Sequence, residues 1–267
     1  MDRREFVSGT AAALAVLAGG EMAQGQAQPG QGGGQRGDGR DIYEQRVYSF
    51  KTAEQKARFV KFFKDVELPA IKRAQVNQVG VFSVLDKPED LSLFMLLVHR
   101  GARSVLALGN ALAADTEYQT AGKDFLAMSS KDKPYERIDS SLLVAFEGMP
   151  KLEAPEAKPR IFELRCYESH SATFGLRKID MFNGGGEIAL FRKTGLKPVF
   201  FGQMIIGKNC PNLTYMVTFA DMKEHDEVWK VFGGSPEWKT LSGDPKYADT
   251  VSNIIRTFLK PEDFSQI

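Results

Sequence analysis

Residues 42–48 read IYEQRVY, and residues 161–167 read IFELRCY. Both stretches fit the pattern Ile-aromatic-Glu-x-Arg-x-Tyr, and the second begins 161 − 42 = 119 residues after the first. This spacing is too long for a solenoid unit and fits a duplicated domain of ordinary size. The sequence therefore predicts two modules with one fold, residues 41–149 and residues 160–267, joined by a proline-rich linker at residues 150–159.

Each module is predicted to run strand, helix, strand, strand, helix, strand. In the first module, Thr52 and Gln55 form a capping box ahead of an amphipathic helix, which should end near Leu68 because Pro69 follows. The order β-α-β-β-α-β with right-handed crossovers gives a four-stranded antiparallel sheet with both helices on one face. The other face needs a cover. We therefore expect an α+β protein whose two tandem modules pack sheet to sheet as a pseudo-dimeric α/β barrel.

The first 40 residues are predicted to lie outside this fold. Arg3, Arg4 and Phe6 precede a short apolar run, which is typical of a twin-arginine signal peptide at residues 1–27. A membrane anchor is the alternative, but the run is shorter than the roughly 20 residues that a span needs. Residues 28–40 are rich in Gly and Gln and predict a disordered linker. The mature protein should be periplasmic or secreted, with no membrane span.

Charge excludes one class of partner. The chain has 35 Lys and Arg against 34 Asp and Glu, and the two signs are interspersed. A nucleic-acid surface needs a concentration of basic residues that this sequence lacks. We therefore expect no nucleic-acid partner.

Further motifs in the second module resemble a known family. Residues 213–219 read LTYMVTF, and Trp229 and Phe232 precede SPEW at residues 235–238. Together with IFELRCY, these stretches are similar to the first strand, the third strand and the Trp-x-x-Phe and Pro-Glu-Trp motifs of the NIPSNAP family. The resemblance implies a ferredoxin-like dimeric α/β barrel, a fold shared with small monooxygenases, haem-degrading enzymes and chlorite dismutases. It implies no agreed reaction.

Strand alternation sorts the side chains of the repeated motif. Phe162, Leu164 and Cys166 should face one side of the sheet, and the polar side chains between them should face the other. We expect the apolar side beneath the helices and the polar side between the two sheets. The candidate binding residues are then Glu163, Arg165, Tyr167, Glu44, Arg46 and Tyr48. The alternative interpretation is a ladder of ion pairs that fixes the register between modules, because buried charges must be paired.

Histidines decide the question of cofactors. Haem would need an axial ligand, usually His, and the chain has only His99, His170 and His225. His225 lies in a charged stretch of helix and should be solvated. No histidine has carboxylates at a convincing metal-ligand spacing. The sequence therefore predicts no metal and no cofactor, and haem held by one of these histidines is the alternative.

The two cysteines and one glycine run leave further expectations open. Cys166 and Cys210 lie on or beside strands that should be antiparallel neighbours, so a disulfide is possible in an oxidising compartment. The alternative is a small buried side chain at Cys166 and a free loop thiol at Cys210. Gly184, Gly185 and Gly186 should interrupt a helix rather than bind a nucleotide.

These observations favour a non-enzymatic, exported α/β-barrel protein that binds a small ligand or associates with itself as a homo-oligomer. A cofactor-free oxygenase or isomerase that uses a cavity between the sheets is the alternative. The volume of that cavity separates the two hypotheses.

Overall fold

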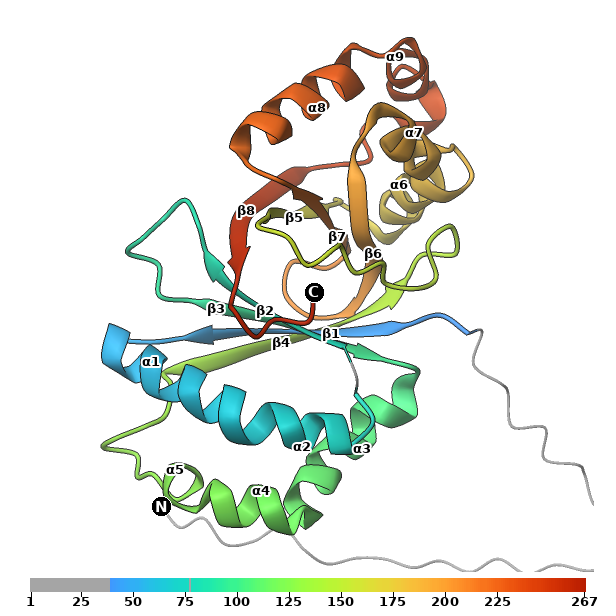
Figure 1. Ribbon diagram of the computed structural model, residues 1–267. Helices are drawn as coiled ribbons and strands as arrows, with labels where there is room; N and C mark the ends of the chain where they lie inside the picture. Colours follow the sequence, from blue (N-terminus) through green and yellow to red (C-terminus); the bar gives the residue numbers. More distant parts are fainter. Residues whose placement is uncertain (1–38, 77) are drawn as a thin grey trace, which may run out of the picture. The chain divides into compact units, whose positions relative to one another are not determined.

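The computed structural model of the protein describes residues 39–76 and 78–267. Its architecture is a closed barrel of antiparallel strands with helices outside it (Figure 1). The predicted signal peptide and most of the predicted linker at residues 28–40 lie outside the described residues.

Eight strands follow one another around the barrel in the order β1-β3-β2-β8-β5-β7-β6-β4. Their bounds are β1 Ile42–Ser49, β2 Gln78–Val84, β3 Leu93–His99, β4 Arg137–Ala145, β5 Ile161–Glu168, β6 Lys197–Ile206, β7 Asn212–Phe219 and β8 Asn253–Pro261. The N-terminal half therefore reads β4-β1-β3-β2 and the C-terminal half β8-β5-β7-β6. The halves join edge to edge through the pairs β2–β8 and β4–β6. The expected mixed fold is confirmed as one continuous barrel.

The helices form two groups on the outer surface. The N-terminal group is α1 Ala53–Phe62, a π-helical turn η1 Phe63–Glu67, α2 Leu68–Arg73, α3 Ala102–Ala114, α4 Thr116–Ala121 and α5 Lys123–Leu126. The C-terminal group is α6 Ala172–Asn183, α7 Glu187–Thr194, α8 Met222–Gly234, α9 Pro236–Ser242 and a 3-10 turn η2 Pro245–Tyr247. In Figure 1, α1–α5 lie beside β1 and β4, whereas α6–α9 lie beside β5–β7.

The first helix does not end before Pro69, as the sequence predicted. It continues through η1 into α2, with Pro69 in the first turn of α2. Proline clashes with the carbonyl four residues earlier in a regular α-helix. The π-turn changes this hydrogen bonding, because the Leu68 N–H bonds to the Phe63 carbonyl five residues back. The helix therefore passes the proline through a local change of pitch.

The helix interruption at residues 184–186 is confirmed. α6 ends at Asn183, and Gly186 adopts a left-handed conformation with φ of +84° immediately before α7. Only glycine takes this region without strain. The chain therefore changes direction between α6 and α7.

Apolar side chains fill the barrel interior. All eight strands contribute to this inner core, including Tyr43 from β1, Phe82 from β2, Phe162 from β5, Phe200 from β6 and Leu259 from β8. Separate cores lie between the barrel and each helix group. Burial of apolar surface on both sides of the sheet is the main force that holds this fold together.

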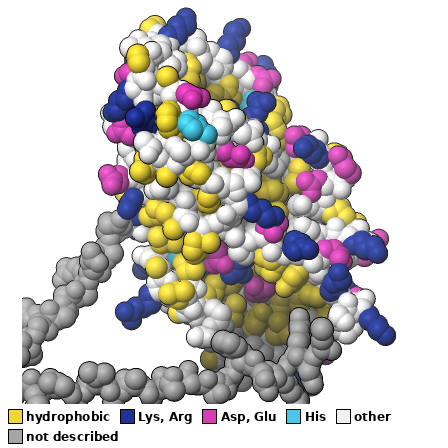
Figure 2. All heavy atoms as spheres, turned by 180° about the vertical axis from the view of Figure 1, so that it is seen from behind, with side chains coloured by type: hydrophobic (Ala, Val, Ile, Leu, Met, Phe, Trp, Pro, Cys, Tyr) yellow, Lys and Arg dark blue, Asp and Glu magenta, His cyan; other side chains and the backbone are white. Residues whose placement is uncertain are grey.

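Basic and acidic side chains are interspersed on the face shown in Figure 2, without a large area of one sign. Within the described residues, every helix is too short or too polar to cross a bilayer.

Candidate functional site

The polar side of the repeated motif faces the helices, so the predicted direction was wrong. Phe162 and Leu164 point into the barrel core. Tyr167 instead packs in the core under the C-terminal helices, and Tyr48 packs on Phe59 of α1 with 4.5 Å between ring centroids. Alternation was predicted correctly, but the assignment of sides was not. The barrel interior is apolar, whereas the helices supply partners for the charged groups.

The N-terminal cluster comprises Glu44, Arg46 and His99. Arg46 Nε donates to Glu44 Oε1 at 2.6 Å, and His99 Nε2 lies 3.0 Å from Glu44 Oε2. His99 Nδ1 lies 3.0 Å from the Ser104 hydroxyl on α3. Burial favours the neutral carboxyl group, but the hydrogen bond from His99 and the charge of Arg46 hold the pKa of Glu44 below its ordinary value. Every polar atom of the Glu44 side chain therefore has a partner.

The C-terminal cluster comprises Glu163, Arg165, His225 and Trp229. Trp229 Nε1 on α8 donates to Glu163 Oε2 at 2.8 Å, and the Arg165 guanidinium lies 4.5 Å from the Trp229 ring. His225 Nε2 is 3.3 Å from Glu163 Oε2, and Arg165 Nη1 is 3.5 Å from Glu163 Oε1. Glu163 Oε1, Arg165 Nε and His225 Nε2 are buried without a hydrogen bond to a described residue. This cluster is less completely bonded than the N-terminal one.

A second buried acid lies near each cluster, where the first helix of each half is irregular. Glu67 ends the π-turn, and its Oε1 lies 3.9 Å from Arg46 Nη1. Burial and the charge of Glu44 together outweigh the charge of Arg46. Burial raises the pKa of Glu67 to about 7. Glu187 begins α7 after the glycine break and pairs with Lys178 at 2.8 Å. Burial also raises the pKa of Glu187, while Lys178 opposes the shift.

The sequence contained a detectable signal for Glu67 and for Lys178, the partner of Glu187. Glu67 continues the i, i+4 stripe of Phe59 and Phe63, and Lys178 lies between Phe174 and Phe182 at the same spacing. A charged residue on an apolar stripe indicates a buried charge that needs a partner.

The prediction that His225 is solvated was also wrong. The ring is 9% exposed and packs against Phe219 and Phe258, with 4.9 and 5.1 Å between centroids. The charged neighbours in the sequence lie on the outer face of α8, while His225 faces the sheet. His170 is exposed and lies against Phe174. Across residues 39–76 and 78–267, no three potential metal ligands come together.

The two cysteines are free thiols, so the hypothesised disulfide is not formed in this structure. Cys166 is half-buried on β5, opposite Thr214 of β7. Cys210 is exposed and its thiol points back into its own loop, 3.6 Å from the Gly207 carbonyl oxygen. The two thiols are thus unbonded, although β5 and β7 are neighbours.

The barrel interior has almost no free space. A cavity of about 10 Å³ lies among the apolar side chains and Gln45. One water molecule needs about 10–15 Å³. The space between the sheets therefore cannot hold an organic substrate in this conformation.

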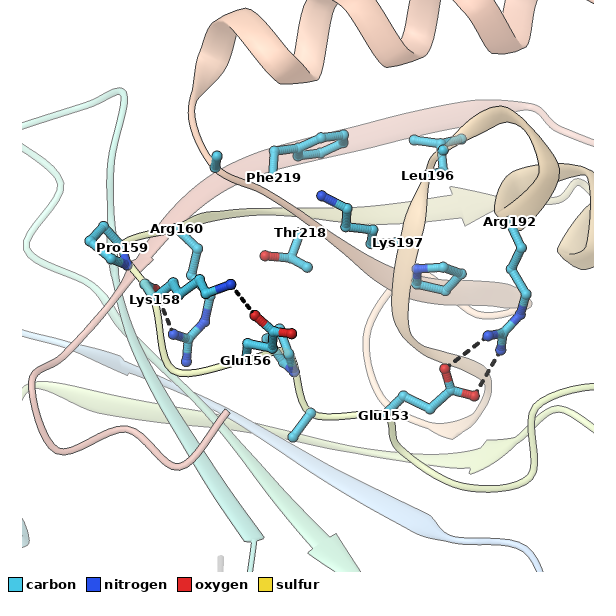
Figure 3. Close-up of a pocket in the computed structure, with 15 residues that line it drawn as sticks. Glu153, Glu156, Lys158, Pro159, Arg160, Arg192, Leu196, Lys197, Thr218 and Phe219 are labelled. Atoms are coloured by element: carbon cyan, nitrogen blue, oxygen red, sulfur yellow. Dashed lines mark hydrogen bonds and ion pairs between the residues drawn. The ribbon is translucent and has the colours of Figure 1, made fainter.

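A much larger hollow lies outside the barrel, and we call it the linker groove. Its volume is about 710 Å³, and it lies between residues 153–160 of the linker and the segment 192–198, with Thr218, Phe219 and Ala220 completing the wall (Figure 3). The start of the linker is fixed, because Asp41 accepts a hydrogen bond from the Leu152 N–H at 3.1 Å. The alternation of basic and acidic residues in the linker is the feature of the sequence that could have indicated this groove.

The linker groove has four basic side chains, and three of them have acidic partners. Arg192 makes a two-pronged pair with Glu153 at 2.8 and 2.9 Å, which Figure 3 shows as two dashed lines. The other two pairs are Lys158 with Glu156, and Lys197 with Glu224.

Arg160 is the fourth basic residue and pairs with no carboxylate among the described residues. Its Nη1 donates to the Lys158 carbonyl oxygen at 2.8 Å, while its Nε is buried without a hydrogen-bond partner. Burial lowers the pKa of Arg160, and no acid opposes this shift. The groove therefore combines apolar walls with one unpaired guanidinium.

Comparison with known proteins supports the fold. A putative monooxygenase from Lactobacillus acidophilus is 10% identical and has a TM-score of 0.55, over 83% of this chain and 94% of that one. A putative monooxygenase from Fusobacterium nucleatum is 11% identical, with a TM-score of 0.54 over 84% and 93%. These likenesses show the fold alone.

A second comparison concerns the family. A NIPSNAP domain protein from Burkholderia xenovorans is 23% identical, with a TM-score of 0.33 over 41% of this chain and 99% of that one. A search of curated proteins found no match. The NIPSNAP family model matches residues 162–266, so the resemblance that the sequence predicted is confirmed for that segment.

Proposed function

We propose that this protein binds a small organic molecule in the linker groove and that its barrel is a scaffold without a cavity of its own. The contrast in volume carries the proposal, about 710 Å³ in the groove against about 10 Å³ inside the barrel. Binding sites for drug-sized ligands usually measure 300–1,000 Å³. The linker groove offers both apolar walls and charged groups, whereas a second hollow of about 460 Å³ is lined by polar and charged side chains such as Lys51, Arg58 and Asp132.

The alternative proposal, a cofactor-free oxygenase or isomerase, requires an internal cavity. The aromatic side chains Tyr43, Phe82, Phe162 and Phe200 occupy that space. The oxygenase alternative is supported by a fold shared with proteins described as putative monooxygenases, at 10% and 11% identity. The filled interior favours the binding function.

We also propose that the two halves are tandem ferredoxin-like modules and that the protein is exported. The equal strand orders β4-β1-β3-β2 and β8-β5-β7-β6 support a duplication. The paired arginines Arg3 and Arg4 support twin-arginine export. Replacement of both by Lys should leave the protein in the cytoplasm, as measured by cell fractionation.

Native mass spectrometry of protein purified from its own cells tests the binding function. Wild-type protein should carry a bound mass that Ala220→Trp removes, because the indole would fill the groove that Ala220 lines. Ala114→Trp, at an exposed position on α3, is the matched control and should retain that mass. Retention of the mass by Ala220→Trp would place the ligand outside the linker groove.

A further inference from the structure

We propose that the ligand of the linker groove is an organic anion, whose charged group binds Arg160 and whose apolar part lies against the groove wall. This inference rests on the binding function proposed above and specifies its ligand class. It begins from the charge balance of the groove, where Arg160 is the basic residue without a carboxylate partner in the described part of the chain.

The geometry of Arg160 favours a carboxylate as the bound group. Its Nε is buried without a partner, and its guanidinium lies 5.5 Å from the Phe162 ring centroid. One hydrogen bond already joins Arg160 Nη1 to the Lys158 carbonyl oxygen. The planar guanidinium offers several donors in a fixed arrangement, which suits carboxylates better than the point charge of Lys does. Because Nε is shielded from solvent, a bound carboxylate would reach the guanidinium through its Nη groups.

The remaining walls require a ligand that is only partly polar. Leu196, Pro198 and Phe219 form one side of the groove, and Pro155 and Pro159 form the other. Leu196 and Phe219 are each 2% exposed, so they form a fixed floor. Lys197 and Thr218 point into the space between the linker and β6 (Figure 3). A carboxylate attached to a flat or branched hydrocarbon fits this combination, whereas a sugar or a free inorganic anion does not use the apolar surface.

Because the other three basic residues of the groove are paired, Arg160 should be the residue that favours anionic ligands over uncharged ones. Arg192, Lys158 and Lys197 already have carboxylate partners at hydrogen-bond distance, so an incoming anion would compete with an existing ion pair. Removal of a paired Arg together with its carboxylate partner leaves the net charge of the protein unchanged. The double substitution Arg58→Gln/Asp132→Asn removes an ion pair at 2.9 Å outside the linker groove and is therefore a control for Arg160→Gln.

Two probes of nearly equal shape test the inference. The probe 2-naphthoate carries a carboxylate, and 2-naphthamide is its uncharged counterpart. Fluorescence titration of full-length protein should give tighter binding of 2-naphthoate. Arg160→Gln should weaken 2-naphthoate at least tenfold and change 2-naphthamide less than twofold, which corresponds to the loss of one charge-assisted contact. The double control should change both probes less than twofold, and thermal melting should confirm that each variant is folded.

The possible failures are distinguishable. If both probes bind equally, Arg160→Gln changes neither and Ala220→Trp blocks both, the ligand class is wrong while the groove remains a binding site. If Ala220→Trp blocks neither probe, the ligand class and the proposed function are both wrong. An absence of 2-naphthoate binding to the wild-type protein would overturn the inference as well.

Discussion

The N-terminal and C-terminal clusters start from the same Glu-x-Arg-x-Tyr strand but complete it with different partners. Glu44 bonds to Arg46 on its own strand and to His99 on β3. Glu163 instead bonds to Trp229 of α8, with His225 one turn earlier on that helix. The strand motif thus determines which side chains lie under the helices. The neighbouring elements determine how well each charge is satisfied.

The second acids differ in the same way. The helix N-caps Thr52 and Ser171 set an offset of 171 − 52 = 119 residues between the halves. At that offset the place of Lys178 is taken by Phe59, because 178 − 119 = 59. Glu187 therefore has a lysine partner at 2.8 Å, whereas Glu67 has only an arginine at 3.9 Å, shared with Glu44. Both halves bury an acid, but only the C-terminal half adds a lysine for it.

Among these substitutions, removal of Lys178 should reduce the free energy of unfolding most. Lys178 is 4% exposed, and its ammonium group lies over the Phe182 ring. Loss of this group would leave the buried Glu187 with the more distant Arg165 as its cationic neighbour. Lys178→Met should reduce the free energy of unfolding by about 3–5 kcal/mol, the usual cost of breaking a buried pair. Urea denaturation at pH 7 measures it.

The double variant Lys178→Met/Glu187→Leu is the control for that experiment. It replaces both charges by apolar side chains, which is often neutral or stabilising. Recovery of most of the lost stability would show that the cost came from the unpaired acid. A double variant as unstable as the single one would mean that Lys178 acts through packing instead.

Glu67 should make stability depend on pH, by about 3 kcal/mol in total. Its pKa is about 7 in the folded protein, against an ordinary value of 4.5, so the folded state binds more protons between these two pH values. Stability from this group is therefore complete below pH 4.5, falls as the pH rises, and is lost above about pH 7. A shift of this size corresponds to about 3 kcal/mol.

The measurement compares wild-type protein with Glu67→Gln, which remains uncharged throughout. The difference in the free energy of unfolding should move in favour of the variant between about pH 4.5 and pH 7 and then stay constant. A difference that is independent of pH would show that Glu67 is ionised throughout this range, with Arg46 as a sufficient partner.

The sequence was sufficient to predict the elements but not which side of the sheet each residue faces. The N-cap Thr52 and the amphipathic helix behind it are as predicted, because local hydrogen bonding and periodicity determine them. The direction of Glu163 depends on a tertiary partner, Trp229, which lies 66 residues away. Alternation fixes two faces without saying which one meets the helices. The face that meets the helices is decided by long-range hydrogen-bond donors such as Trp229.

Two further features were not predicted, because both depend on contacts between distant segments. One is the continuation of the first helix past Pro69, and the other is the linker groove. A proline predicts the end of a helix when only the local chain is considered, but burial of Leu68 and Ile71 favours continuation past it. The groove depends on residues 153–160 lying against residues 192–198. Such contacts between distant segments leave only weak traces in local patterns.

The two histidines provide the most direct comparison of the clusters, with a smaller expected effect. Both ring nitrogens of His99 have buried or half-buried partners at 3.0 Å. In the described part of the chain, His225 Nδ1 bonds to the exposed Asp226 at 2.8 Å, whereas Nε2 lies 3.3 Å from Glu163 without a hydrogen bond and among aromatic rings. His99→Phe should cost about 2–3 kcal/mol, because Glu44 loses a charge-assisted hydrogen bond in a buried site. His225→Phe should cost less than about 1 kcal/mol, since phenylalanine fits the same aromatic surroundings. Urea denaturation of both variants at pH 7 measures the difference.

The C-terminal half already contains a natural form of the first substitution. At the offset of 120 residues between the third strands, the position of His99 corresponds to Phe219, because 99 + 120 = 219. Glu163 tolerates a phenylalanine there because Trp229 donates to it from α8. Equal costs for the two variants would mean that the hydrogen bonds of His99 add nothing to stability. The two clusters would then differ in geometry but not in strength.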